Sequence, residues 1–233
     1  MRRCKTHLVC VCLLFLAAVP AYCQRGTFDV GGGRTADTFA GLPTSSGEVV
    51  DINGEFAVFK YNPKTERPAV VGGGELRLPT DSNNHAKEYA VYGGVHFQFR
   101  KLTVGVDGQV RRLYLPVAFV DNQFFVRDRM SVFELPLVLR YKFGSSERLF
   151  VEAKGAPEFT PHWHRSSSAL QLPNPNFDHG YFVQGSVGYM FGKWYVKGTY
   201  ENRYFKFLEN PNNPSNLYNW RTNMITGSVG ITF

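Results

Sequence analysis

The chain has 233 residues, of which 26 are Lys or Arg and 19 are Asp or Glu, and 43% of its residues are hydrophobic. That length suffices for one domain, and no apolar run beyond the N-terminal segment approaches the ~20 residues of a transmembrane helix, so a helical membrane protein is excluded. The basic residues form no stripe with interleaved aromatic residues, so no nucleic acid is expected as a partner.

Residues 1–23 have the pattern of a cleaved secretory signal peptide. Three basic residues begin the segment, an apolar run over 8–19 follows, and 21–23 supplies a cleavage site whose exact position the pattern leaves open. A lipid-modified Cys23 is the alternative. All four cysteines lie in this segment, so no disulfide framework is expected in the mature chain, whose 23 basic and 19 acidic residues give a charge of +4.

The mature chain, 24–233, is predicted to be a single all-β domain. The 23 glycines, the aromatic content of 15% and the segments of alternating polarity are typical of a membrane β-barrel, with a soluble β-sandwich as the alternative. The alternation predicts strands over 27–35, 50–61, 68–79, 89–100, 102–114, 131–143, 148–159, 180–191, 193–205 and 221–233.

The connections between these strands are predicted to alternate in length. Short ones lie at 62–67, 100–101, 144–147 and 192–193, and long ones at 36–49, 80–88, 115–130, 160–179 and 206–220. Short turns at one end and long loops at the other are typical of outer-membrane barrels. We therefore expect a closed antiparallel up-and-down transmembrane β-barrel of 8 to 10 strands, with ten preferred. Residues 24–66 form either its first hairpin or an N-terminal extension.

The two faces of the strands differ in polarity. Residues 133, 135, 137, 139, 141 and 143 are all apolar or aromatic, and this parity is predicted to face lipid. The other parity collects charges of both signs, which we expect to pair across a narrow interior instead of lining an open channel. This predicted network comprises Glu75, Arg77, Arg100, Asp107, Arg111, Glu134, Arg140, Glu152, Lys154, Lys197, Glu201 and Arg203.

Two prolines predict a defect in one hairpin. Pro136 and Pro157 lie on neighbouring predicted strands, and folding about the turn at 144–147 brings them within about two residues of opposite positions. Neither can donate a hydrogen bond to the ladder, so a bulge or a local break in pairing is expected there.

Residues 133–143, Phe-Glu-Leu-Pro-Leu-Val-Leu-Arg-Tyr-Lys-Phe, resemble a strand that is common in the OmpA-like and PorT-like outer-membrane β-barrel superfamily. The resemblance extends over about 89–233 and includes Phe233, which matches the terminal aromatic residue that the barrel assembly machinery reads. It implies a Gram-negative outer-membrane location, contact with membrane lipids and lipopolysaccharide, and no particular activity, because members include anchors, adhesins and small channels.

One segment suggests chemistry. His164 and Ser166 resemble the His-Xaa-Ser pair of lipid A deacylase barrels, although Ser167-Ser168-Ala169 follows where those enzymes have Asn-Ala-Gly. The same region offers His162, His164 and His179 as candidate metal ligands. An ordinary exposed loop is the alternative that we prefer for both.

The sequence therefore favours a non-enzymatic outer-membrane barrel that serves envelope structure or surface interaction through its loops, with no cofactor. A small passive, porin-like channel and a lipid A-modifying hydrolase using His164 and Ser166 remain as alternatives. The pattern identifies neither the extracellular ligand nor the oligomeric state.

Overall fold

The computed structural model describes residues 25–39, 44–59, 68–81, 85–114, 118–120, 124–126, 128–165, 177–208 and 219–233. The predicted signal peptide lies outside these residues, as does Ser166. In the described part of the chain no helix is long and apolar enough to cross a membrane.

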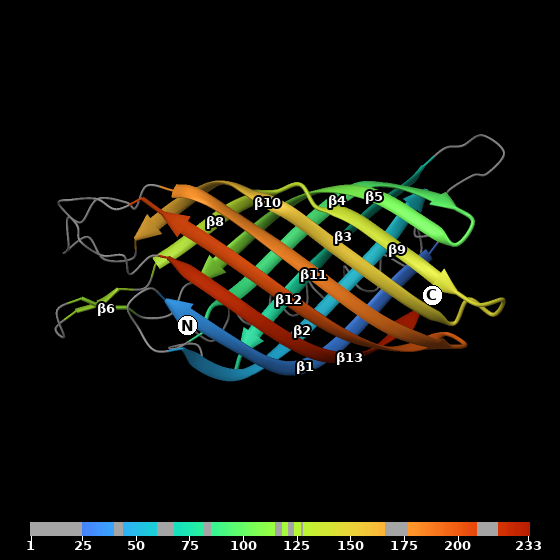
Figure 1. Cartoon of the computed structure of the whole chain (residues 1–233), viewed down its shortest axis with the longest axis horizontal. Coiled ribbons are helices and arrows are strands. Elements are labelled where there is room, and N and C mark those ends of the chain that lie inside the picture. The colour runs from blue at the N-terminus through green and yellow to red at the C-terminus, as the bar shows by residue number, and fades with distance from the viewer. Residues whose placement is uncertain are drawn as a thin grey trace, which may run out of the picture.

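The strands close into a ten-stranded antiparallel barrel in which each wall strand pairs with the next in sequence and β1 pairs with β13 (Figure 1). The predicted fold class is thus confirmed, with ten strands. The wall consists of β1 (Arg25–Phe39), β2 (Ser45–Phe59), β3 (Ala69–Pro79), β4 (Lys87–Phe99), β5 (Leu102–Tyr114), β8 (Asp128–Glu134) with β9 (Leu137–Phe143) as two halves of one strand, β10 (Leu149–Arg165), β11 (Phe177–Phe191), β12 (Trp194–Phe207) and β13 (Trp220–Thr232). A small hairpin of β6 (Ala118–Val120) and β7 (Phe124–Val126) lies beyond the wall strands.

Residue Phe233 takes part in the closure of the barrel. Its amide donates to the Gly26 carbonyl at 3.0 Å and its carbonyl accepts from the Gly26 amide at 2.8 Å, which extends the β1–β13 ladder by one pair. The ring lies over Gly26, where a Cβ atom would overlap it. The terminal aromatic residue therefore packs on the seam between the first and last strands.

The connections depart from the predicted alternation at the first two hairpins. Residues 36–49, predicted as a long loop, belong mostly to β1 and β2, which leaves only 40–44 between them, while 60–68 between β2 and β3 is longer than predicted. The later turns, at 100–101, 144–148 and 192–193, are short and lie at the end where Figure 1 marks the C-terminus. Gly144 and Gly192 there take φ angles of 70° and 69°, which glycine adopts without strain. We call this the short-turn end, and the opposite one the loop end.

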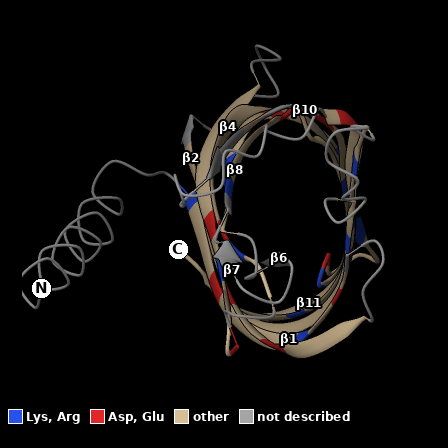
Figure 2. Ribbon diagram, turned by 90° about the vertical axis from the view of Figure 1, so that its left-hand side faces the viewer, with Lys and Arg blue, Asp and Glu red and all other residues tan. Residues whose placement is uncertain are grey.

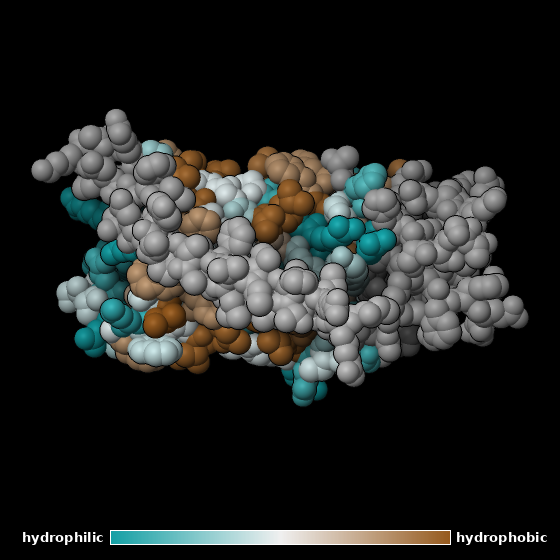
Figure 3. Space-filling view, turned by 180° about the vertical axis from the view of Figure 1, so that it is seen from behind, coloured by the Kyte–Doolittle hydropathy of each residue, from teal (hydrophilic) through white to brown (hydrophobic). Residues whose placement is uncertain are grey.

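The outer wall is apolar. Val91 and Ile225 are 65% and 64% exposed, although both lie in the middle of paired strands. Figure 3 shows hydrophobic side chains gathered over the middle of the visible wall, with hydrophilic ones toward its ends. The residues assigned to this face by parity, including Phe133, Leu137 and Leu139, do point outward. An exposed apolar band of this kind needs lipid or detergent around it.

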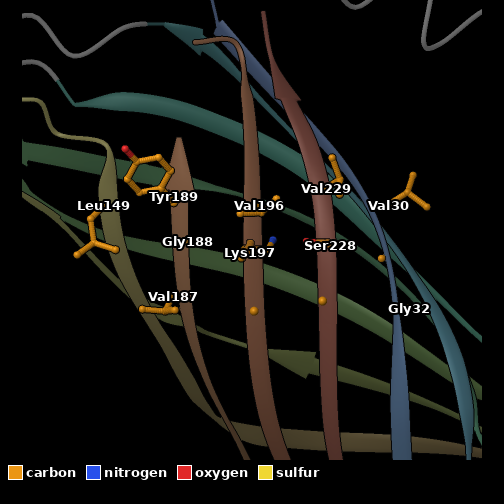
Figure 4. A pocket seen from close by; sticks show the side chains of 13 residues that line it. Val30, Gly32, Leu149, Val187, Gly188, Tyr189, Val196, Lys197, Ser228 and Val229 are labelled. Carbon is orange, nitrogen blue, oxygen red and sulfur yellow. The ribbon is translucent and has the colours of Figure 1, made fainter. Parts of the chain in front are cut away.

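A shallow groove of about 620 Å³ crosses this wall over β10 to β13 and β1 (Figure 4). Gly32, Gly227 and Gly198 are in register on three adjacent strands and face outward, so no side chains fill the surface there. Val30, Val187 and other apolar side chains line the groove. It is a depression in the apolar band, and Lys197 and Ser228 also contribute to its lining.

The predicted proline defect is present. β10 pairs with β9 up to Gly155 and with β8 from Glu158, so the two intervening residues of β10, including Pro157, are unpaired on that side. On the other side the β5 ladder also lacks the pairs of Asp107 and Gly108, although the Asp107 amide donates to the Pro136 carbonyl at 3.0 Å. The defect therefore interrupts both ladders of this wall strand, with one hydrogen bond kept across the gap on the β5 side.

Amide hydrogen exchange should report this defect. We expect the amide of Leu135 to exchange faster than those in the middle of the β11–β12 hairpin, because that hairpin pairs without interruption from His179 to Phe191. Mass spectrometry of the detergent-solubilised barrel with peptide-level resolution would measure both regions. Equal protection in the two regions would contradict the expectation.

Candidate functional site

The interior of the barrel is filled by charged side chains. Figure 2, which views the barrel from its loop end, shows Lys, Arg, Asp and Glu positions along the wall that surrounds the interior. At the middle of the barrel three buried guanidinium groups meet six buried carboxylates. These are Arg77, Arg111 and Arg203, with Asp51, Glu75, Glu88, Glu134, Glu158 and Glu201.

Arg77 on β3 spans the interior. Its Nη1 and Nη2 donate to the two carboxylate oxygens of Glu201 on β12 at 2.7 and 2.6 Å, although β3 and β12 are not neighbours in the wall. Its Nε donates to Asp51 at 3.3 Å, and Nη1 also reaches Glu88 at 3.1 Å. The planar guanidinium suits this two-point contact, which ties opposite parts of the barrel together.

Arg111 and Arg203 complete the central layer. Arg111 donates to Glu75 at 2.7 Å, to Glu88 at 2.8 Å and to Glu134 at 3.2 Å. Arg203 lies 3.2 Å from Glu134 and 3.6 Å from Glu158, but within the described residues neither its nitrogens nor the Glu158 oxygens make a hydrogen bond of good geometry. The weakest part of the network thus adjoins the proline defect, because Glu158 follows Pro157 and pairs with Glu134 in register.

A second polar layer lies toward the short-turn end. Asp29 on β1 accepts hydrogen bonds from Tyr195 at 2.7 Å and Lys197 at 3.0 Å, both on β12. Arg140 on β9 donates to Glu152 on β10 at 2.6 Å. Ion pairs thus occupy the interior at its middle and toward the short-turn end.

The loop end of the interior is closed by apolar side chains instead. Along β12 the inward residues change from Glu201 and Arg203 to Phe205 and Phe207 as the strand approaches this end. Phe205 stacks on Trp220 with ring centroids 5.4 Å apart. Together with Leu113, Met130 and Val132, these residues form a fully buried cluster. The interior is therefore closed by ion pairs at its middle and by an apolar cluster above them.

Beside the apolar cluster lies a group of three polar residues, which we call the rim cluster: Ser45, His85 and Asp37. Nδ1 of His85 lies 2.7 Å from Oδ2 of Asp37, and Nε2 lies 3.5 Å from Oγ of Ser45. His85 and Asp37 are almost fully buried, whereas Ser45 is half-buried. His85 lies in the connection between β3 and β4. Its hydrogen bond with Asp37 raises the pKa of the imidazole above its usual value despite burial, and the negative charge of Asp81 acts in the same direction.

The residues of the predicted charge network lie in the interior with one exception. Glu75, Arg77, Asp107, Arg111, Glu134, Glu152, Glu201 and Arg203 are buried there, and Arg140, Lys154 and Lys197 are half-buried. The exception is Arg100, which strand parity placed inside. β4 ends at Phe99, and Arg100 is an exposed turn residue with a φ of 53°.

The candidate catalytic and metal-binding residues of the sequence lie around the β10–β11 connection. His162 on β10 and His179 on β11 are exposed, and His179 lies 3.2 Å from Asp178. The side chain of His164 and the whole of Ser166 lie outside the described residues. In the described part of the chain no three His, Cys, Asp or Glu residues are grouped so that they could hold a metal ion.

Sequence reasoning missed the rim cluster and Glu88. Asp37, Ser45 and Glu88 fell outside the predicted strands, because β1, β2 and β4 start earlier or end later than their alternation indicated. If the predicted strands had been extended by a few residues, Asp37 would have shared the inward face of Asp29, and Ser45 that of Asp51. His85 lies in a connection, where no periodicity exists to place it.

Comparisons with known proteins bear on the fold alone. No family model matches the chain, and no curated protein sequence matches it. Similar solved structures include Neisserial surface protein A, with a TM-score of 0.40 and 9% sequence identity, where the match covers 89% of this chain and 97% of that one. The outer-membrane protease OmpT from Escherichia coli has a TM-score of 0.45 and 11% identity, with 90% of this chain and 97% of that one covered. The translocator domain of the autotransporter NalP from Neisseria meningitidis has a TM-score of 0.46 and 10% identity, with 98% of this chain and 96% of that one covered. With TM-scores below 0.5, no activity is carried over from them.

Proposed function

We propose that the protein is an outer-membrane β-barrel that serves envelope structure or surface interaction through the segments at its loop end. The single observation that carries the proposal is the combination of an apolar outer wall with an interior closed by ion pairs and aromatic rings. The wall suits a lipid environment, and the closed interior leaves no wide path for solutes. Molecules outside the cell would then meet the loop end.

The sequence supports the same location. The predicted signal peptide at 1–23 accounts for export, and the likeness of 133–143 to OmpA-like and PorT-like barrels points to the Gram-negative outer membrane. Lipids and lipopolysaccharide would then contact the apolar wall, and the assembly machinery would act on the strand that ends at Phe233. The two-point closure between Phe233 and Gly26 gives that residue a further role in the finished barrel.

Tag accessibility on intact cells tests the location and orientation. An epitope inserted between Arg165 and Phe177 should bind antibody on whole cells, because that connection is at the loop end. The matched control is the same epitope inserted in the 144–148 turn at the opposite end, which should bind antibody only after the outer membrane is permeabilised. The reverse pattern, or a mature protein that fractionates without detergent, would contradict the proposal.

A rescue experiment then tests whether the loop end carries the role. A strain that lacks the protein should lose either resistance to envelope stress or binding to surfaces, and the full-length protein should restore it. A variant with 166–176 replaced by a short turn should insert normally but fail to restore surface binding. If this variant restores every phenotype, the 166–176 loop does not carry the role.

A further inference from the structure

The rim cluster contains the three groups of a nucleophilic hydrolase in their functional order. We propose that Ser45, His85 and Asp37 form an acyl-transfer site that cleaves carboxylic esters with an apolar acyl group. This inference goes beyond the proposed function, because it assigns chemistry to the loop end of the barrel.

The strand register brings the first and last members together. Asp37 and Ser45 are directly opposite each other in the β1–β2 ladder, and both have the parity of the inward residues Asp29 and Asp51. His85 comes from the β3–β4 connection and lies between them, 2.7 Å from Asp37 and 3.5 Å from Ser45 through its two different ring nitrogens. A base with a carboxylate on one nitrogen and a hydroxyl on the other is the arrangement that activates serine.

The surroundings hold the histidine and the carboxylate in place. Nε1 of Trp220 donates to Asp37 at 3.1 Å, and the Thr222 hydroxyl donates to the same carboxylate oxygen. Opposite the imidazole the wall has a glycine, Gly47, where any Cβ atom would overlap the ring. The backbone of β2 is thus shaped to admit His85 at this position.

The chemistry needs only an ester and water. Oγ of Ser45 attacks the ester carbonyl carbon while its proton passes to Nε2 of His85. When the tetrahedral adduct collapses, the carbon–oxygen bond to the alcohol breaks and the alcohol leaves with that proton. Water, activated by the same nitrogen, then cleaves the acyl-serine and releases the carboxylic acid. Asp37 accepts a hydrogen bond from Nδ1 of His85 throughout and keeps the ring oriented.

The distance between Nε2 and Oγ must shorten for the first step. At 3.5 Å it exceeds the reach of about 2.6 to 3.2 Å for proton transfer, as is common before substrate binds. An apolar acyl group is favoured because Ala86, next to His85, packs against the cluster of Trp220 and Phe205. A charged or strongly polar acyl group would have to lose its hydration beside these rings.

Labelling with a fluorophosphonate probe tests the site. Purified barrel in detergent, first shown to be folded by its heat-dependent shift in gel mobility, should be labelled on Ser45, as peptide mass spectrometry would identify. Ser45→Ala should abolish this label, and His85→Ala should slow labelling on the order of 100-fold, because the base is lost. Ser46→Ala is the matched control, since that serine is adjacent but faces outward, and it should label like the wild type.

Two further measurements separate catalysis from a structural role. Gly47→Ala should fold yet label slowly, because its methyl group displaces His85 without removing any member of the cluster. Only the neutral imidazole accepts a proton, and Asp37, with Asp81 also nearby, raises the pKa of His85. The rate of labelling should therefore increase as the pH rises, with a midpoint above the usual histidine pKa of about 6.5. A folded wild-type barrel that is not labelled on Ser45, or undiminished labelling in His85→Ala, would overturn the proposal.

Discussion

Replacing Arg77 with methionine is expected to destabilise the barrel by about 3 to 5 kcal/mol, the cost of removing one partner from a buried ion pair. Arg77 donates to Glu201 through both terminal nitrogens, to Glu88 through Nη1 and to Asp51 through Nε. Methionine fills a similar volume but leaves these carboxylates without their shared cation. The loss appears as a lower urea midpoint for unfolding from detergent micelles.

Two variants control this experiment. Arg148→Met removes the same type of side chain from an exposed position before β10 and should change the unfolding free energy by less than about 0.5 kcal/mol. The double variant with Arg77→Met and Glu201→Met should lose less unfolding free energy than the two single variants lose together, because it leaves fewer unpaired charges. An Arg77→Met barrel as stable as the Arg148→Met barrel would show that the central network contributes no stability.

Strand parity was sufficient to place the wall of this barrel. The run from Phe133 to Phe143 alternates so regularly that its outward and inward sides could be read without a structure, and the same parity put Arg77 and Glu201 in the interior. The two prolines located the ladder break for an equally local reason, because a missing amide proton is a property of the residue itself. These features depend on the sequence within one strand or hairpin.

The features that could not be predicted depend on where strands end and on contacts between residues that are distant in the sequence. Arg100 has the parity of an inward residue but lies one position beyond the end of β4, and Glu88 lies one position before the predicted start of that strand. The pairing of Arg77 with Glu201 joins residues 124 apart in sequence, and nothing local specifies which cation meets which carboxylate. The place of His85 depends on a glycine and an aspartate from two other strands.

The closed interior also predicts how the protein behaves in a membrane. Ions that cross the barrel would have to pass the Arg77–Glu201 bridge at its middle and the stacked rings of Phe205 and Trp220 above it. Barrels of eight to ten strands have interiors that side chains can fill, whereas porins of 16 to 18 strands keep a water-filled channel. We therefore expect the inserted barrel to be nearly impermeable to ions, despite the many charges that it contains.

Single-channel recording in planar lipid bilayers tests the closed-barrel account most directly. Insertion is verified separately by protease protection in liposomes, and a porin of 16 strands recorded under the same conditions provides the positive control. The account predicts no conductance or only small, rare events from the wild-type protein. Stable currents in the nanosiemens range would contradict it and would favour the passive-channel alternative.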